Sequence, residues 1–582
     1  MGKAFDCPAI QGWETEDTRM TTVRNTRLLG TIPSLIIICL VSFPAYAQYG
    51  GGTTASAQTN TYVFLPGQST VVQTGGIAGV HWTYSVEGLF QLTVDPNAGT
   101  ASFAHVDANA TDDSQLQRTL DPNEVFGMTS LLGAVLDDMT ISFMGKAADG
   151  SDVLITVTIE DDLAYLVGQT TPPPNTADFF LFSLDAVAQR KYGGGKGEPN
   201  DPYLIYTAEQ MNAIGVEPND WDKHFKLMAN VDLSEYTGDD FNIIGYYVDW
   251  DNNKPFTGVF DGNDHTISNF TYTSTDRDYV GLFGYVADPN TQINNMGLID
   301  PNVDAGTGEC VGSLVGRLGA GFRRGDIVNC YCEGGSVSGF QFVGGLVGFH
   351  NWRSTITNCY ATSTVLGVED VGGLVGANHG IITNCYTIGN TTSHRRLGAL
   401  AGSNEGTISN CYSMGSVSGD RFVGGLVGQN GGTYSGREGM AFPGDIDNCY
   451  SRCSVTGTAI IGGLVGYNNV GTITKCHATG RVMGTVDVGG LVGAGNRLEF
   501  WSEEVTFSFW DTQTSGQVTS DGGTGKTTAE MQRERTFTDT GWDFVDETAN
   551  GTEDIWWILE GQGYPRLWWE LVEENSVVSP EN

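Results

Sequence analysis

The chain has 582 residues, more than one ordinary compact core can organise, so its length favours several domains or one elongated repeat domain. Lysine and arginine number 29 against 68 acidic residues, and the net charge of -39 disfavours nucleic acid and anionic membranes as partners of the whole molecule. The 80 glycines show neither the period of collagen nor the proline content of a linker, so they need another structural explanation.

Residues 1–47 have the features of an export signal. The apolar run 28–43 (LLGTIPSLIIICLVSF) follows two arginines and precedes an Ala-Tyr-Ala site that ends at Ala47, as in a cleaved signal peptide. Acidic residues precede Met20, which favours Met20 as the true start. We therefore expect a protein that is secreted or held at the cell surface. A retained anchor is the alternative, although the run is shorter than the ~20 residues of a spanning helix.

Residues 48–190 are predicted to form a small domain that is β-sandwich-like or a β-barrel. Runs such as HWTYSVEGLFQLTV and SDVLITVTIE alternate apolar and polar residues, and turn clusters such as DPNAG separate them. Proline and glycine clusters then mark a boundary, with a linker at residues 191–201. Nothing here indicates catalysis, because His81 and His105 are isolated.

Residues 202–280 are expected to form an N-terminal cap and the first turns of a repeat domain. Thr207-Ala-Glu-Gln210 fits a capping box at the start of a short helix. FTGVFDGNDHTISNF indicates strands joined by an Asp-Gly-Asn turn, whose residues must tolerate positive φ. Asp261, Asp264 and His265 could form a metal site, but turn chemistry explains them more simply. The sequence leaves open whether calcium occupies the acidic turns.

A glycine motif recurs eight times, from GLFG at residues 281–284 to GGLVG ending at Gly493, at intervals of 32, 32, 28, 26, 26, 38 and 27 residues. Six copies are followed by Asn-Cys-Tyr or a variant, with cysteines at Cys330, Cys359, Cys385, Cys411, Cys449 and Cys476. Short strands repeated about every 26 residues predict an all-β solenoid, in which each repeat is one turn and neighbouring turns pair as parallel strands ~4.8 Å apart.

The spacing within one repeat predicts where each turn bends. Val371 and Leu374 are three residues apart, so in a straight strand they would face opposite sides. Both can face inward only if the chain turns a corner between them. We place corners at Gly372-Gly373 and at Asn384, because both residue types tolerate left-handed backbone, and we expect successive asparagines to stack.

The G-L-x-G core, its NCY companion, the FDGNDHTISNF lead-in and the TAEQMNAIG cap resemble the GLUG-repeat family of secreted bacterial proteins over roughly residues 197–570. The resemblance implies a right-handed parallel β-helix over residues 281–510 and a C-terminal cap and tail at 511–582. Family members include adhesin-like surface proteins and non-catalytic segments of IgA-cleaving metallopeptidases. The peptidase activity does not carry over, because no histidine is followed by the glutamate of a His-Glu-x-x-His motif.

The six motif cysteines are expected to form a buried column, in which a free thiol packs as a small hydrophobe. A nucleophile would require one distinct cysteine with a basic neighbour. Disulfides between adjacent turns are disfavoured, because the strand spacing exceeds the usual Cβ separation of ~3.5–4.5 Å. Cys310, Cys332 and Cys453 lie outside the column and could pair. Nine cysteines follow the signal, so at least one is free or intermolecular.

Two glycine-rich segments resemble nucleotide-binding loops but lack features that such loops require. VGGLVG opens no helix, and GGTGKTT at residues 522–528 has Ser520 where a phosphate-binding loop needs its first glycine. No nucleotide partner is expected. The C-terminal aromatics in IWWIL and YPRLWWE are predicted to plug the open end of the solenoid together with a helix at TTAEMQ. A sugar-binding platform is the alternative for these rings.

We expect the binding site in the loops that lengthen some repeats, since insertions in repeat arrays gather on one face, and that face often binds a ligand. Arginine binds carboxylates and sulfates, and rings stack on sugars. The candidate residues for an extracellular glycan or surface ligand are Phe322, Arg323, Arg324, Trp352, Arg353, Tyr434, Arg437 and Phe442. The alternative is that these are ordinary solvated loops.

The sequence thus predicts a non-catalytic adhesin-like surface protein without a cofactor, calcium apart. The competing function is a β-helix polysaccharide lyase or hydrolase acting on acidic glycans. Such an enzyme needs converging carboxylates for acid and base work. Asp445 with Asp447 and Glu369 with Asp370 are the only pairs that we consider, and neither recurs as a ladder across turns.

Overall fold

The computed structural model describes ten strands between residues 60 and 190, and residues 192–570 except 249–252, 434–440 and 496–503. The predicted export signal lies outside these described residues. Within them, no helix combines the length and apolar character needed to cross a membrane.

The N-terminal strands form one antiparallel sheet. β1 pairs with both β4 and β10, so eight strands close into a ring and β2 and β3 extend from β10. Of the sandwich and the barrel that the sequence left open, this pairing gives the closed sheet of a barrel, which leaves the ring without an unpaired edge. The strands are β1 (Asn60–Phe64), β2 (Thr70–Gly75), β3 (Val80–Ser85), β4 (Phe90–Asp95), β5 (Thr100–His105), β6 (Ser130–Val135), β7 (Thr140–Lys146), β8 (Asp152–Glu160), β9 (Leu163–Thr171) and β10 (Leu181–Arg190).

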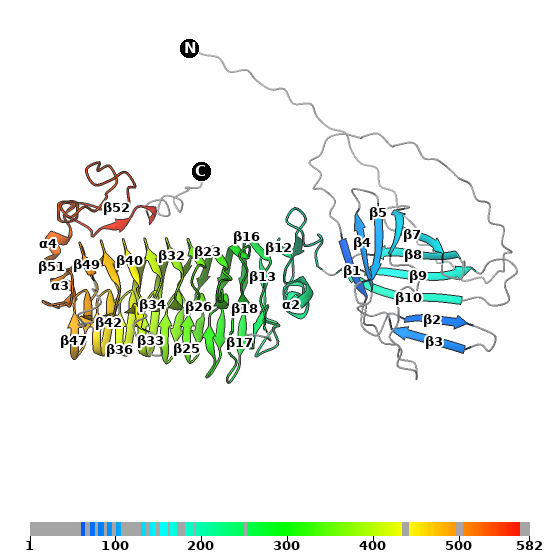
Figure 1. The fold of residues 1–582 in the computed structure, drawn as a ribbon, viewed down its shortest axis with the longest axis horizontal. Coiled ribbons are helices and arrows are strands. Elements are labelled where there is room, and N and C mark those ends of the chain that lie inside the picture. Colours follow the sequence, from blue (N-terminus) through cyan, green and yellow to red (C-terminus); the bar gives the residue numbers. More distant parts are fainter. Residues whose placement is uncertain are drawn as a thin grey trace, which may run out of the picture. The chain divides into compact units, whose positions relative to one another are not determined.

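The repeat domain is a parallel β-solenoid built from two long sheets (Figure 1). Within the described residues, the larger sheet has 29 strands, from β11 (Tyr203–Ile205) to β51 (Thr524–Lys526). The smaller sheet has eight, one for each glycine motif. These are β18 (Phe283–Val286), β22 (Val315–Leu318), β26 (Val347–His350), β31 (Val375–Asn378), β34 (Ala401–Asn404), β37 (Val427–Asn430), β43 (Val465–Asn468) and β48 (Val492–Gly495).

One turn illustrates the plan. It runs through β30 (Glu369–Gly372), β31, β32 (Ile381–Thr383) and the first part of β33 (Tyr386–Gly398), whose end pairs with β30 and belongs to the next turn. Each strand pairs in register with its copies, so that Ile356, Ile382 and Ile408 lie side by side in the core. The predicted solenoid is therefore confirmed.

The corners are where the sequence placed them, but the glycines act differently. Val371 and Leu374 are both fully buried on either side of a bend, and Asn384 has a φ of 54°. The left-handed residue before the bend is Asp370, with a φ of 53°, whereas Gly372 and Gly373 are not left-handed. A Cβ on either glycine would collide with a carbonyl oxygen, that of Val375 or of a residue in the next turn. The motif glycines therefore permit close approach of the backbone instead of positive φ.

The predicted columns are present. The six motif cysteines are fully buried, and each backbone N–H from Cys330 to Cys449 donates to the thiol sulfur of the next turn at 3.4 Å. All nine described cysteines are free and buried, so the structure gives Cys310, Cys332 and Cys453 no disulfide. The corner asparagines form a surface ladder of amide hydrogen bonds of 2.9–3.2 Å. Its rungs are Asn295, Asn329, Asn358 and Asn384.

Two further columns were not predicted. The residues after the motif cysteines stack as flat rings, with centroids 4.7–5.1 Å apart and planes within 8° of parallel. They are Tyr331, Tyr360, Tyr386, Tyr412, Tyr450 and His477. A second amide ladder lies inside the solenoid at the end of the smaller sheet. It joins His350, Asn378, Asn404, Asn430 and Asn468 at 2.7–3.0 Å.

Both ends of the solenoid carry short helices. At the N-terminal end, α2 (Ala208–Val216) begins with the predicted cap, in which the Thr207 hydroxyl accepts from the Gln210 N–H. At the other end lie α3 (Thr512–Ser515), α4 (Thr528–Met531) and α5 (Arg535–Thr538). The helix predicted at TTAEMQ is α4, and it begins with a capping box formed by Thr527 and Glu530.

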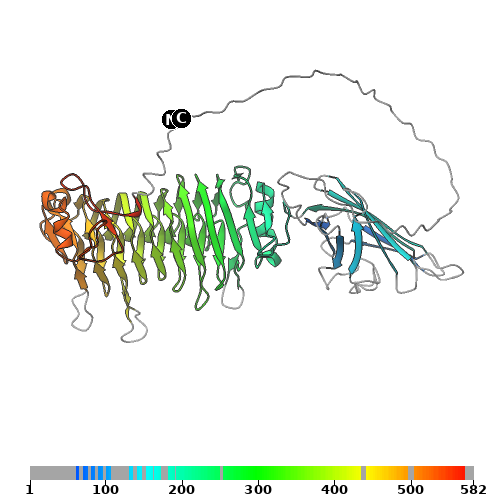
Figure 2. The ribbon, with the colours of Figure 1, turned by 90° about the horizontal axis from the view of Figure 1, so that it is seen from above.

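The C-terminal aromatics do not plug the open end. The segment that carries β52 (Trp556–Trp557) and β53 (Arg566–Leu567) folds back along the flank of the last turns (Figures 1 and 2). Trp569 packs on the Tyr412 ring at 5.5 Å, and the buried Glu570 accepts hydrogen bonds from the Tyr450 hydroxyl. The stacked tyrosines present a flat apolar face, and this segment buries part of it.

Candidate functional site: an arginine and aromatic face

The insertions in the first two long repeats bring three of the expected site residues together. The loops follow β22 and β26, which are neighbouring strands of the smaller sheet. The Phe322 and Trp352 rings lie with centroids 6.0 Å apart. The Arg353 guanidinium lies 5.5 Å from the Phe322 centroid and 5.7 Å from that of Trp352. Phe322 is 75% exposed and Trp352 is 49% exposed, so the cluster faces solvent.

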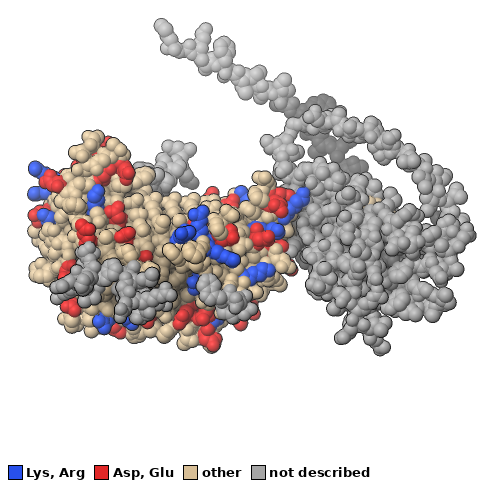
Figure 3. Space-filling view, viewed as in Figure 1, with Lys and Arg blue, Asp and Glu red and all other residues tan. Residues whose placement is uncertain are grey.

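The remaining arginines of these loops border that cluster. Arg323 and Arg324 are exposed, and the Arg324 Nε donates to the Pro289 carbonyl at 3.3 Å. Within the described part of the chain, none of Arg323, Arg324 and Arg353 forms an ion pair with a carboxylate. Figure 3 shows lysine and arginine side chains gathered over the turns around β26. The loops thus present guanidinium groups that no described acidic residue neutralises. We refer to Phe322, Arg323, Arg324, Trp352 and Arg353 as the loop platform.

The third long insertion does not join the loop platform. Phe442, which is 44% exposed, lies in a short hairpin of β38 (Gly432–Thr433) and β39 (Ala441–Phe442). This hairpin follows β37, four strands from β22 in the smaller sheet, which corresponds to ~19 Å at the usual strand spacing. The three insertions follow strands of the same sheet, as expected, but Phe442 does not share a cluster with Phe322, because stacking separates insertions from different turns. Tyr434 and Arg437 lie outside the described residues.

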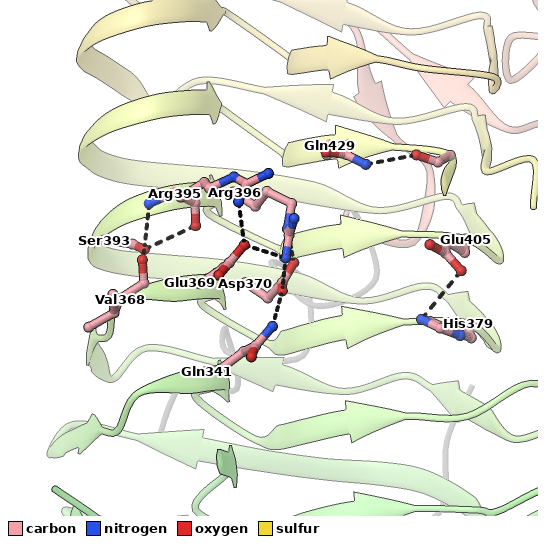
Figure 4. Close-up of polar contacts among 11 residues, drawn as sticks. Gln341, Val368, Glu369, Asp370, His379, Ser393, Arg395, Arg396, Glu405 and Gln429 are labelled. Atoms are coloured by element: carbon pink, nitrogen blue, oxygen red, sulfur yellow. Dashed lines mark hydrogen bonds and ion pairs between the residues drawn. The ribbon is translucent and has the colours of Figure 1, made fainter. Parts of the chain in front are cut away.

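A second charged cluster, not predicted as a binding site, lies on the strands before the bend (Figure 4). Arg396 on β33 makes two hydrogen bonds of 2.6 Å to the buried Asp370 carboxylate on β30. Its guanidinium also lies 2.6 Å from the Glu369 carboxylate, which pairs with Arg395 at 3.0 Å. Burial opposes the charge of Arg396, but the hydrogen bond and charge of Asp370 outweigh it and raise the guanidinium pKa.

A histidine and a glutamate lie beside this cluster, after β31 and β34. His379 Nε2 and the Glu405 carboxylate are 3.7 Å apart. Burial is the main cause that lowers the pKa of His379 to about 4 and raises the pKa of Glu405. His379 is therefore neutral at pH 7, and the contact is not an ion pair there.

The carboxylates of the enzymatic alternative are held by other groups. Glu369 and Asp370 are committed to arginines, as described above. On β40 (Asp445–Asp447), Asp445 accepts from the Thr472 hydroxyl at 2.7 Å and Asp447 accepts from the Asn448 amide at 2.7 Å. Burial raises the pKa of Asp447.

The candidate metal residues contact turn and strand partners. Asp261 accepts from the Asn263 N–H at 3.0 Å and lies 3.3 Å from the Lys226 ammonium, and Asp264 has a φ of 61°. His265 Nδ1 lies 3.2 Å from the Asn230 amide oxygen. Among the described residues, no three histidine, cysteine or acidic side chains group closely enough to hold a metal ion.

Comparison with known proteins agrees with the repeat geometry. The family described as the GLUG motif matches residues 343–366 and 457–483. Both segments begin in the strand before the bend and pass through the glycine motif. The chain therefore carries GLUG motif repeats, as the resemblance implied.

Two relatives share about a third of this chain. Halomucin of Haloquadratum walsbyi is 30% identical over 185 residues, which are 31% of this chain and 2% of halomucin. A Gly-rich membrane protein of Evansella cellulosilytica is 33% identical over 197 residues, which are 32% of this chain and 21% of that protein. The chain thus spans a small part of either relative's length.

Proposed function

We propose that this GLUG-repeat protein is a non-catalytic extracellular or cell-surface scaffold whose loop platform binds a glycan bearing carboxylate or sulfate groups. One observation carries the proposal. Three arginines without a described acidic partner lie beside two exposed aromatic rings, in a chain with 68 acidic residues. Acidic side chains are abundant, so exposed arginines without one are available to an external anion.

The geometry suits a charged sugar. The Phe322 and Trp352 rings offer apolar faces on which a pyranose can stack, and a guanidinium can donate two parallel hydrogen bonds to a carboxylate or sulfate. The net charge of -39 repels a polyanion at long range, so attraction has to be local. We therefore expect binding to short anionic oligosaccharides to be stronger than the overall charge suggests.

Further observations support a location at the cell surface and a right-handed solenoid. The export signal predicted at residues 1–47 and the membrane protein among the relatives favour the cell surface. The solenoid is expected to coil to the right, because parallel crossover connections nearly always do. Absence of catalysis is proposed because Glu369 and Asp370, one candidate carboxylate pair, are committed to Arg395 and Arg396.

The test is a glycan array probed with the full chain and two matched variants. The first combines Arg323→Ala, Arg324→Ala, Arg353→Ala and Trp352→Ala. The second combines Arg421→Ala, Arg481→Ala and Arg533→Ala, which removes the same charge from exposed arginines elsewhere. We expect the first variant to lose at least tenfold in affinity for sulfated or uronate glycans, about 1.4 kcal/mol or more. Equal losses of affinity in both variants would contradict binding at the loop platform, because they would show that only the total charge matters.

A further inference from the structure

A pocket of about 440 Å³ lies beside the first glycine repeat. Its volume falls within the range of about 300–1,000 Å³ that is typical of small-molecule sites. Two segments line it, residues 245–248 and residues 277–279. The lining contains three tyrosines, Tyr246, Tyr247 and Tyr279, and two charged residues, Arg277 and Asp278. None of these residues belongs to the loop platform.

The tyrosines are held in place by other rings. Tyr246 meets the buried Trp221 edge to face at 5.7 Å, yet 43% of Tyr246 remains exposed. The Tyr247 ring lies 5.0 Å from Tyr279 and meets Tyr285 at 5.4 Å and 90°. Tyr246 and Tyr247 form β14 (Tyr246–Tyr247), which pairs antiparallel with β15 (Asn253–Lys254). The aromatic surface is thus organised before any ligand binds, which lowers the entropic cost of binding.

The backbone conformation at Gly245 and Tyr279 sets the positions of these tyrosine rings. Gly245 has a φ of 79°, and a Cβ there would collide with the Tyr285 carbonyl oxygen, so only glycine lets β14 leave the solenoid at this point. Tyr279 has a φ of 58°, as do the equivalent residues of later turns, such as Cys310 and Phe342, so the left-handed backbone before the bend belongs to the repeat and places the Tyr279 ring beside Tyr247.

The charged residues favour a neutral ligand. The Arg277 guanidinium donates to the Tyr272 hydroxyl at 2.7 Å, which fixes one of its donors and leaves others for the pocket. The Asp278 carboxylate accepts from the Glu309 N–H at 2.8 Å through Oδ1, and no described residue donates to Oδ2. A carboxylate in the wall repels an anionic ligand but accepts hydroxyl hydrogen bonds. An acceptor and a donor beside aromatic rings match the hydroxyls and apolar face of a sugar.

We propose that this pocket binds a neutral pyranose residue of an oligosaccharide. The sugar ring stacks on Tyr246 or Tyr247, and its hydroxyls donate to Asp278 and accept from Arg277. We refer to this as the tyrosine pocket, and it goes beyond the loop platform, which takes the opposite class of sugar.

The tyrosine pocket and the loop platform lie on adjoining turns. The Arg317 guanidinium lies 5.2 Å from the Tyr247 centroid and 5.0 Å from that of Phe349 on the next turn. Tyr247 also packs against the cluster that contains Ala320, two residues before Phe322. A neutral sugar in the pocket therefore binds near the anion platform without sharing its residues.

The test is calorimetric titration of the full chain with four neutral hexasaccharides, β-1,4-glucan, β-1,3-glucan, α-1,4-glucan and β-1,4-mannan. We expect at least one to bind, and Tyr247→Ala to weaken that binding by about tenfold or more, as loss of a stacking ring does. Tyr247→Phe keeps the ring and should retain binding, whereas Asp278→Asn should weaken it severalfold. Tyr206→Ala, which removes a tyrosine with 41% exposure outside the pocket, is the matched control.

The outcomes separate the two sites. Trp352→Ala with Arg353→Ala should leave neutral hexasaccharide binding unchanged even if the loop platform binds nothing. The absence of binding by all four hexasaccharides would overturn the pocket proposal. Equal affinities of Tyr247→Ala and the wild type would overturn it as well. Circular dichroism of each variant establishes that the solenoid is folded.

Discussion

Replacing His350 by asparagine should make the protein less sensitive to acid. His350 occupies a place that asparagine fills at Asn378, Asn404, Asn430 and Asn468 in later turns. Its Nδ1 lies 2.7 Å from the Asn378 amide oxygen, while its buried Nε2 has no hydrogen-bond partner in the described structure. His350→Asn would therefore extend the internal ladder by one amide and remove an unsatisfied nitrogen.

The pH dependence follows from the pKa of this histidine. Burial lowers the pKa of His350 from 6.5 to about 4. Above pH 6.5 the imidazole is neutral in both the folded and the unfolded chain, so it does not make the free energy of unfolding depend on pH. Between pH 6.5 and 4 only the unfolded chain binds the proton, and the free energy of unfolding falls as the pH falls. At pH 5 the loss from this one group is about 2 kcal/mol.

Urea unfolding of the wild type and His350→Asn at pH 7.5 and pH 5 measures this effect. The wild type should lose about 2 kcal/mol more than the variant over this range, and His477, whose burial lowers its pKa to about 3, contributes equally to both. At pH 7.5 the variant should be at least as stable as the wild type. Identical losses in the two proteins would refute a buried neutral His350.

Three other outcomes are expected. Asn404→Ala deprives Asn378 Nδ2 and Asn430 Oδ1 of partners at 2.7 and 2.8 Å and should cost about 2–6 kcal/mol in urea unfolding. Asn384→Gly, in the exposed ladder, should cost less than about 1 kcal/mol, and similar values would contradict the internal ladder. Asp370→Ala removes two hydrogen bonds of the Arg396 guanidinium, which keeps its contact with Glu369, and should cost about 1.5–3 kcal/mol, a loss that Arg396→Met in the same chain should partly restore. A thiol reagent should modify none of the nine buried cysteines at or after Cys310 until the solenoid is denatured, and modification of native protein would argue for an open core.

The repeat core could be predicted because each turn copies the last. Apolar residues three apart locate the bends, and a corner asparagine such as Asn384 reports its left-handed backbone directly through its residue type. The glycines were less informative. Gly372 lets two backbone segments approach closely and does not adopt a positive φ. The sequence alone does not show which of these two properties a glycine supplies.

What the sequence did not reveal depends on contacts between distant segments. The internal amide ladder joins residues 26 to 38 apart, and its first member is a histidine, which hides the pattern. Trp569 packs on Tyr412 far along the chain, so the fold-back of the C-terminal segment has no local signal. The platform was only partly predicted because stacking order decides which insertions meet, and Phe442 lies too many turns from Phe322.

The most direct test of the loop platform is a hydrogen-exchange footprint on the full chain with a short sulfated dextran oligosaccharide. The proposal predicts slowed exchange at the amides of residues 319–326 and 351–355, with neutral dextran of the same length giving no such change. Protection by both sugars alike, or protection confined to other turns of the solenoid, would contradict it.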